Sequence, residues 1–77
     1  MSSNKITHFP KELENFTNLQ CIIIVNNEVS IVENISNNLI TLNVTSNPIK
    51  MIHHTCLDKV KKIAYFSCDN LDKLFHL

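Results

Sequence analysis

Three cysteines and four histidines are the residues of this chain that could support metal binding or nucleophilic catalysis. The densest group is His53, His54 and Cys56. A zinc site needs about four ligands that converge tetrahedrally. Adjacent side chains of an extended segment point to opposite sides, so only one of these two histidines can face the core side. His8 and His76 lie far away along the chain. We therefore expect no metal site.

A cysteine–histidine pair could also act as a nucleophile, formed by Cys56 with His53 or by Cys21 with a distant histidine. Such a pair needs an electropositive site, an orienting acid and an oxyanion pocket, and the sequence gives no sign of them. The chain contains no glycine. Phosphate-binding loops, dinucleotide fingerprints and nucleophile elbows are therefore absent in their usual form. We expect a protein that is not an enzyme and holds no cofactor.

Charge and hydropathy narrow the classes of partner. Seven basic and seven acidic side chains balance to zero formal charge, whereas nucleic-acid binding usually requires a basic surplus. The cluster Lys59, Lys61 and Lys62 leaves nucleic-acid binding as a minor alternative. The apolar run at residues 21–25 is too short to cross a bilayer, and no N-terminal stretch predicts a signal peptide. The odd number of cysteines suggests reduced thiols, so we expect a cytoplasmic protein that binds neither nucleic acid nor membrane.

Three segments of the chain share one spacing: an apolar residue, two variable residues, an apolar one, a variable one and a third apolar one. Two variable residues and then an Asn or Cys follow. The segments start 20 and 21 residues apart, and self-similarity at such a period is typical of repeat architectures. The apolar triplets are Leu19/Ile22/Ile24, Leu39/Leu42/Val44 and Val60/Ile63/Tyr65, and the residues that follow them are Asn27, Asn47 and Cys68.

This spacing resembles the leucine-rich-repeat family, whose pattern is L-x-x-L-x-L-x-x-N/C-x-L. The resemblance covers residues 4–74, because the pattern continues backwards from Leu19 to Ile6 and Asn4 stands where an earlier repeat would place its Asn. It implies an α/β solenoid with a short parallel sheet on the concave face and irregular or short helical convex segments. The alternative is a small α+β domain in which the spacing is a coincidence. The implied single domain covers residues 1–77, with a partial repeat at 4–18 and repeats at 19–38, 39–59 and 60–77.

In this arrangement each repeat contributes a short strand, expected at residues 21–25, 41–45 and 62–66, and the three strands pair in parallel. A buried Asn, or Cys in the last repeat, would turn the chain inward and satisfy backbone groups of neighbouring turns. A short helix is expected within residues 70–77. The inward strand residues would be Ile22/Ile24, Leu42/Val44 and Ile63/Tyr65, and the return segments would close the core with Ile6/Phe9, Val29/Val32, Ile49/Ile52 and Leu71/Leu74.

The outward strand positions form the candidate binding surface, because solenoid proteins bind partners on such surfaces. Several of these residues are apolar where solvent favours polar groups, and a contiguous exposed apolar patch usually marks an interface. A pair of lysines would add a basic rim that suits an acidic partner. The alternatives are that a terminal segment covers this face or that its apolar residues are scattered. The predicted partner-binding residues are Cys21, Ile23, Val25, Ile40, Thr41, Asn43, Thr45, Lys61, Lys62, Ala64 and Phe66.

We therefore expect a protein–protein interaction module that binds a protein partner through the concave sheet. The alternative is a structural subunit that forms homo-oligomers through its ends or edges, since the outermost strands would be unpaired and no capping units are recognised. The composition, rich in Asn and Ile and free of glycine, suggests an AT-rich genome such as that of a large DNA virus or an amoeba-like organism. By analogy, a viral protein of this kind would act in the host cytoplasm on a host signalling complex.

Overall fold

The computed structural model describes residues 5–74 and forms a small α/β protein built from short elements. Asn4 and residues 75–77, which belong to the predictions above, lie outside the described residues. In chain order the elements are the 3-10 helix η1 (Lys11–Asn15), strands β1 (Cys21–Ile23), β2 (Ile31–Val32), β3 (Thr41–Asn43) and β4 (Met51–Ile52), the 3-10 helix η2 (His54–Cys56), helix α1 (Leu57–Lys61), strand β5 (Tyr65–Ser67) and helix α2 (Leu71–Leu74).

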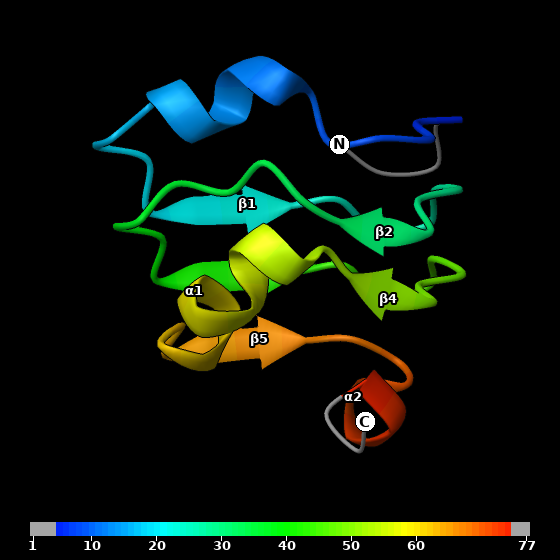
Figure 1. Ribbon diagram of the computed structural model, residues 1–77. Helices are drawn as coiled ribbons and strands as arrows, with labels where there is room; N and C mark the ends of the chain where they lie inside the picture. Colours follow the sequence, from blue (N-terminus) through cyan, green and yellow to red (C-terminus); the bar gives the residue numbers. More distant parts are fainter. Residues whose placement is uncertain (1–4, 75–77) are drawn as a thin grey trace.

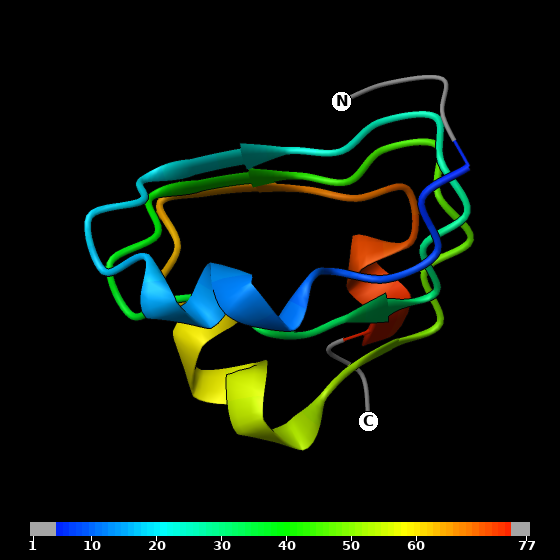
Figure 2. The same ribbon diagram turned by 90° about the horizontal axis from the view of Figure 1, so that it is seen from above.

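Two short parallel sheets form the framework of the molecule. The larger sheet has the order β1-β3-β5, and β2 pairs with β4 in the smaller one. Figure 1 shows the strands of each sheet stacked one above another, and Figure 2 shows the larger sheet along one side, with β2, η1 and α1 along the opposite side. The predicted parallel pairing of three distant segments is confirmed. The smaller sheet is new, because irregular or helical structure was expected in the return segments.

The hydrophobic core lies between the two sheets. In β1 and β3 the middle residues, Ile22 and Leu42, are buried while their neighbours are not, because successive side chains of a strand point to opposite faces. They share one buried cluster with Val32 and Ile52 of the smaller sheet. Neither sheet is wide enough to bury its own apolar face, so each depends on the other. The remaining members of the core are Phe9, Ile24, Val29, Ile35, Leu39, Val44, Ile49, Cys56, Val60 and Leu74.

Two buried asparagines hold the turns that follow β1 and β3. Each is preceded by a residue with positive φ, Asn26 (55°) and Ser46 (59°), which turns the chain toward the core. Oδ1 of Asn27 accepts a hydrogen bond from the Ile6 N–H (3.1 Å), and its Nδ2 donates to the Val25 carbonyl (2.8 Å).

Asn47 repeats this arrangement one turn further along the chain. Its Oδ1 accepts from the Val29 N–H (3.1 Å), and its Nδ2 donates to the carbonyl of Ile24 (2.7 Å) and to that of Val44 (3.1 Å). The amide therefore ties its own turn to the preceding one, as expected for these asparagines.

The third strand pairs in a different register from the predicted one. β5 covers Tyr65–Ser67 rather than residues 62–66, and Phe66 lies opposite Leu42. Tyr65, predicted to point inward, is 59% exposed. β5 follows β3 by 24 residues, whereas β3 follows β1 by 20. The predicted interval of 21 residues and the triplet Val60/Ile63/Tyr65 are therefore wrong.

A helical segment accounts for the longer interval before β5. Between β4 and β5 the chain forms η2 and α1. Val60 is therefore buried as a residue of α1, not as a residue of the segment that leads into a strand. Ile63, Phe66 and Cys68 then occupy the places of Leu39, Leu42 and Val44, and all three pack against the core. Tyr65 is tolerated on the outside because its hydroxyl stays in contact with water.

The last turn closes without a buried asparagine. Cys68, predicted at the Asn position, is half-buried against the core. Leu71, which lies 24 residues after Asn47, takes the place that Asn47 has in the preceding turn. The turn is joined to its predecessor by Asp69, whose Oδ2 accepts a hydrogen bond from the Ser46 N–H (3.0 Å). α2 agrees with the predicted short terminal helix over the part of that stretch that the structure describes.

Candidate protein-binding face

The candidate site is the face of the larger sheet that points away from the core, here called the outer sheet face. Within β1 and β3 its side chains alternate with the buried residues Ile22 and Ile24 or Leu42 and Val44, and the exposed residues Ile40 and Ala64 directly precede β3 and β5. Every member is exposed or half-buried. The outer sheet face consists of Cys21, Ile23, Ile40, Thr41, Asn43, Ala64, Tyr65 and Ser67.

Three large side chains give this face an apolar character. Ile23 is 48% exposed, Ile40 is 46% exposed and Tyr65 is the most exposed large hydrophobic residue described. The Tyr65 N–H donates to the carbonyl of Ile40 (3.1 Å), which directly precedes β3, so the backbones of these two residues are neighbours. Strands of one sheet lie about 4.8 Å apart, so a single partner can cover all three side chains. Contiguous exposed apolar area is typical of an interface.

Polar groups interrupt the apolar side chains at the centre of the face. Oδ1 of Asn43 accepts hydrogen bonds from the hydroxyl and the N–H of Thr45 (3.0 and 3.2 Å). This fixes the orientation of the Asn43 amide. Its Nδ2 has no hydrogen bond within residues 5–74, so it is available to donate to a partner.

The structure places most of the predicted partner-binding residues on or beside this face. Cys21, Ile23, Ile40, Thr41, Asn43 and Ala64 belong to it. Val25 and Thr45 are half-buried just beyond the ends of β1 and β3, where the Asn26 N–H donates to the Thr45 carbonyl (3.2 Å). Lys61 and Lys62 are exposed at the end of α1, which Figure 2 places on the side opposite the larger sheet, so they do not belong to the outer sheet face.

Phe66 does not belong to the outer sheet face. Its side chain is half-buried and packs against the core, beside the buried Leu42. The prediction that Phe66 contacts a partner from this face is therefore wrong. Tyr65 takes an outward position in β5 in place of Phe66, and Ser67 is the other outward residue of this strand. Ile63, Phe66 and Cys68 have the same spacing as Val60, Ile63 and Tyr65. The sequence is therefore compatible with both strand registers, and the spacing alone does not distinguish the correct one.

The histidines and cysteines that the structure describes do not converge. His53 and His54 stack on each other, with ring centroids 4.4 Å apart, and Nδ1 of His53 is hydrogen-bonded to the Thr55 hydroxyl (2.7 Å). The three cysteines are free thiols, with Cys21 exposed and Cys56 buried. Within residues 5–74, no three His, Cys, Asp or Glu side chains are grouped so that they could hold a metal ion.

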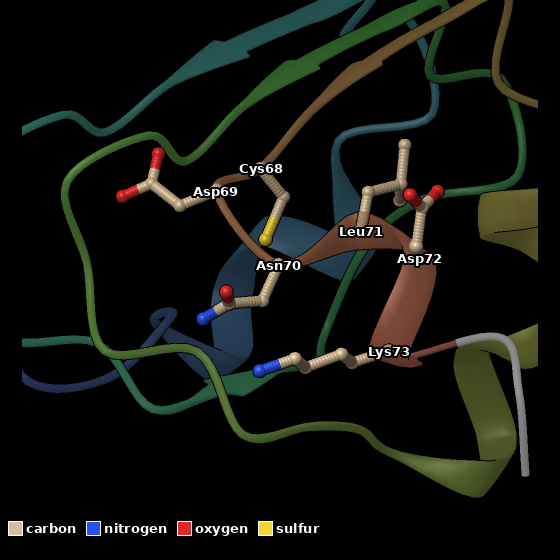
Figure 3. Close-up of a pocket in the computed structure, with 6 residues that line it drawn as sticks. All are labelled: Cys68, Asp69, Asn70, Leu71, Asp72 and Lys73. Atoms are coloured by element: carbon tan, nitrogen blue, oxygen red, sulfur yellow. The ribbon is translucent and has the colours of Figure 1, made fainter.

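A shallow hollow lies around the start of α2 and is lined by the consecutive residues from Cys68 to Lys73. Figure 3 shows Asn70 and Lys73 directed to one side and Asp69 directed away from the helix. The Asp69 carboxylate is engaged by the Ser46 N–H. The hollow therefore belongs to the turn that ends the larger sheet, and we assign no ligand to it.

The comparisons with known proteins leave the outer sheet face to be interpreted from its own geometry. No protein family, curated protein or solved structure matches the chain. Among the described residues, no helix has the length and apolar character needed to span a membrane.

Proposed function

We propose that this protein is a binding module that recognises another protein through the outer sheet face. The observation that carries the proposal is the set of three large exposed apolar side chains, Ile23, Ile40 and Tyr65, in or beside a sheet whose opposite face is packed into the core. A face held rigid in this way loses little conformational entropy when a partner covers it.

We propose further that the chain is a short leucine-rich-repeat solenoid. Parallel strands 20 and 24 residues apart support it, because both intervals lie within the range of about 20–29 residues that such repeats use. The hydrogen bonds between the side-chain amide of Asn47 and the backbone of the preceding turn, at Val29 and Ile24, also support it. In such a stack, neighbouring turns place their outward residues side by side.

The partner that fits this face has a mainly apolar or aromatic contact surface. No charged residue belongs to the outer sheet face, and its polar members are short side chains such as Thr41 and Ser67. Tyr65 is the natural anchor, since tyrosine combines a large apolar ring with a hydroxyl that can stay hydrogen-bonded at the rim. A host protein would be such a partner if the source is viral.

Binding can be tested with the double variant Ile40→Ser/Tyr65→Ser and the control Met51→Ser. All three side chains are exposed, but Met51 lies in β4 of the smaller sheet. Partners captured from lysate by the unaltered chain are identified and then measured as purified proteins. We expect the double variant to raise Kd at least about tenfold, because truncating an anchor at the centre of an interface costs about 2 kcal/mol or more. The control should leave Kd within about twofold of the value for the unaltered chain. Partners that bind the double variant as tightly as the unaltered chain would contradict the proposal.

A further inference from the structure

The end of the molecule beyond β5 carries an apolar hollow that is separate from the outer sheet face. It is lined by Val60, Lys61, Ile63, Phe66 and Leu71, and four of these five residues are apolar. Ile63, Phe66 and Leu71 are only half-buried, whereas the equivalent residues of the preceding turn, Leu39, Leu42 and Asn47, are buried. β5 is the outermost strand of its sheet within the described residues. We call this surface the β5 end.

The opposite end of the molecule has complementary properties. Figure 1 shows η1 beyond β1, at the end of the stack farthest from β5. No residue of η1 is buried, and its carboxylates Glu12 and Glu14 are exposed. Phe16, which follows η1 directly, is 56% exposed. This surface, here called the η1 end, therefore presents an exposed aromatic ring close to two acidic groups.

The charged side chains of the two ends have no ion-pair partner among residues 5–74. Glu12 and Glu14 form no ion pair with other described residues, and the same holds for the exposed Lys61 and Lys62 beside the apolar hollow. The asymmetry extends to the whole sequence, because residues 1–38 carry four Glu against two Lys, and residues 39–77 carry five Lys against three Asp. The η1 end thus combines two carboxylates and one lysine, Lys11, with an exposed phenyl ring, and the β5 end combines two lysines with an apolar hollow.

We propose that these two ends bind each other, so that the η1 end of one copy of this chain docks on the β5 end of a second copy. Phe16 would cover the hollow formed by Ile63, Phe66 and Leu71, while Glu12 and Glu14 approach Lys61 and Lys62. The contact joins two different surfaces of the same protein, so it is heterologous and does not close on itself. Further copies add in the same direction, and the outer sheet face of every copy stays accessible.

The size of the molecule sets the strength of this contact. The Cα trace measures 29 × 26 × 19 Å, so an end-to-end contact buries an area near the lower limit of about 1,000 Å² for a specific interface. Interfaces of this size are weak and transient. We therefore expect association in the micromolar range, with a marked dependence on ionic strength because the charges involved are exposed.

Sedimentation velocity over a series of protein concentrations, at low and at high salt, tests the proposal with charge-reversed variants. Glu12→Lys/Glu14→Lys carries two basic ends, and Lys61→Glu/Lys62→Glu carries two acidic ends. Each variant alone should stay monomeric, with Kd raised at least about tenfold, since attraction becomes repulsion at the contact. An equimolar mixture of the two should associate again, because every contact between unlike copies then joins an acidic end to a basic end.

Three further variants locate the contact. Phe16→Ser should also abolish association, and its exposed position lets the fold be checked independently by circular dichroism. Lys50→Glu is the matched control, because Lys50 is exposed next to β4 and lies at neither end, so association should be unchanged. Ile40→Ser on the outer sheet face should leave association unchanged as well. A monomer at millimolar concentration, a mixture that fails to associate, or association lost through Ile40→Ser would overturn the proposal.

Discussion

Replacing Asn47 with alanine removes the side chain that joins two successive turns of this protein. Asn47 is buried, and its amide is hydrogen-bonded to the Val29 N–H and to the carbonyls of Ile24, Val44 and Thr45. The Thr45 carbonyl keeps a second donor, the Asn26 N–H. The other three backbone groups lose the partner that the amide provides.

The expected cost follows from those three groups. Val29, Ile24 and Val44 are fully buried, so water cannot easily replace the missing amide. A buried polar group left without a partner costs about 1–3 kcal/mol, and partial relaxation reduces the sum. We expect the free energy of unfolding to fall by about 3–6 kcal/mol, which is comparable to the entire stability of a small domain, roughly 5 kcal/mol.

Urea unfolding followed by far-ultraviolet circular dichroism measures this loss. With a slope of about 1 kcal/mol/M for a chain of this size, the midpoint should fall by about 3 M or the variant should be unfolded without urea. Asn47→Leu, which retains the side-chain volume, should be nearly as destabilised, because the loss comes from hydrogen bonds. Asn37→Ala is the control, since Asn37 is exposed and makes no hydrogen bond with the other described residues. A loss below about 1 kcal/mol for Asn47→Ala would refute the role assigned to this amide.

Three other perturbations address the core, the thiols and the last turn. Leu42→Ala should lower the free energy of unfolding by about 2–5 kcal/mol in the same urea assay, because Leu42 is fully buried in the central strand. A loss no larger than that of a surface variant would contradict the placement of Leu42 in the core. In thiol titration with a disulfide reagent, Cys21 should react readily in the native protein, whereas Cys56, only 1% exposed, should react at the rate of unfolding; equal rates would be incompatible with the fold. Asp69→Ala removes the carboxylate that accepts the Ser46 N–H at an exposed position and should cost about 1 kcal/mol, while an unchanged urea midpoint would show that this bond contributes nothing.

The first two turns could be predicted from the sequence because their apolar spacing has one consistent interpretation. Ile22 and Ile24 in one turn and Leu42 and Val44 in the next are buried as expected, and the parallel pairing of β1 with β3 follows from their equal spacing. Asn47 could be assigned a linking role because a buried amide must satisfy both its donor and its acceptor groups.

The third turn could not be predicted because two registers fit the same residues. Val60, Ile63 and Tyr65 match the apolar spacing, and so do Ile63, Phe66 and Cys68. The choice depends on η2 and α1, whose short helices have no strong sequence signal. The smaller sheet was missed for a similar reason, since β2 and β4 are two residues long and gain their stability from tertiary packing.

The corrected register changes which side chains the candidate site presents. With Phe66 turned toward the core and Tyr65 turned outward, the anchor of the outer sheet face moves by one residue. The same shift leaves Phe66 at the β5 end, where it lines the apolar hollow. Both proposals therefore depend on the pairing of β5 with β3, which determines that Tyr65 and Phe66 belong to different surfaces.

Cross-strand nuclear Overhauser effects between β3 and β5 test this pairing directly. The structure predicts contacts between the backbone protons of Leu42 and Phe66 and between those of Ile40 and Tyr65, whose N–H donates to the Ile40 carbonyl. Contacts that instead pair Leu42 with Ile63 would place Tyr65 inside and Phe66 outside. That result would contradict the outer sheet face, the β5 end and the functions proposed for them.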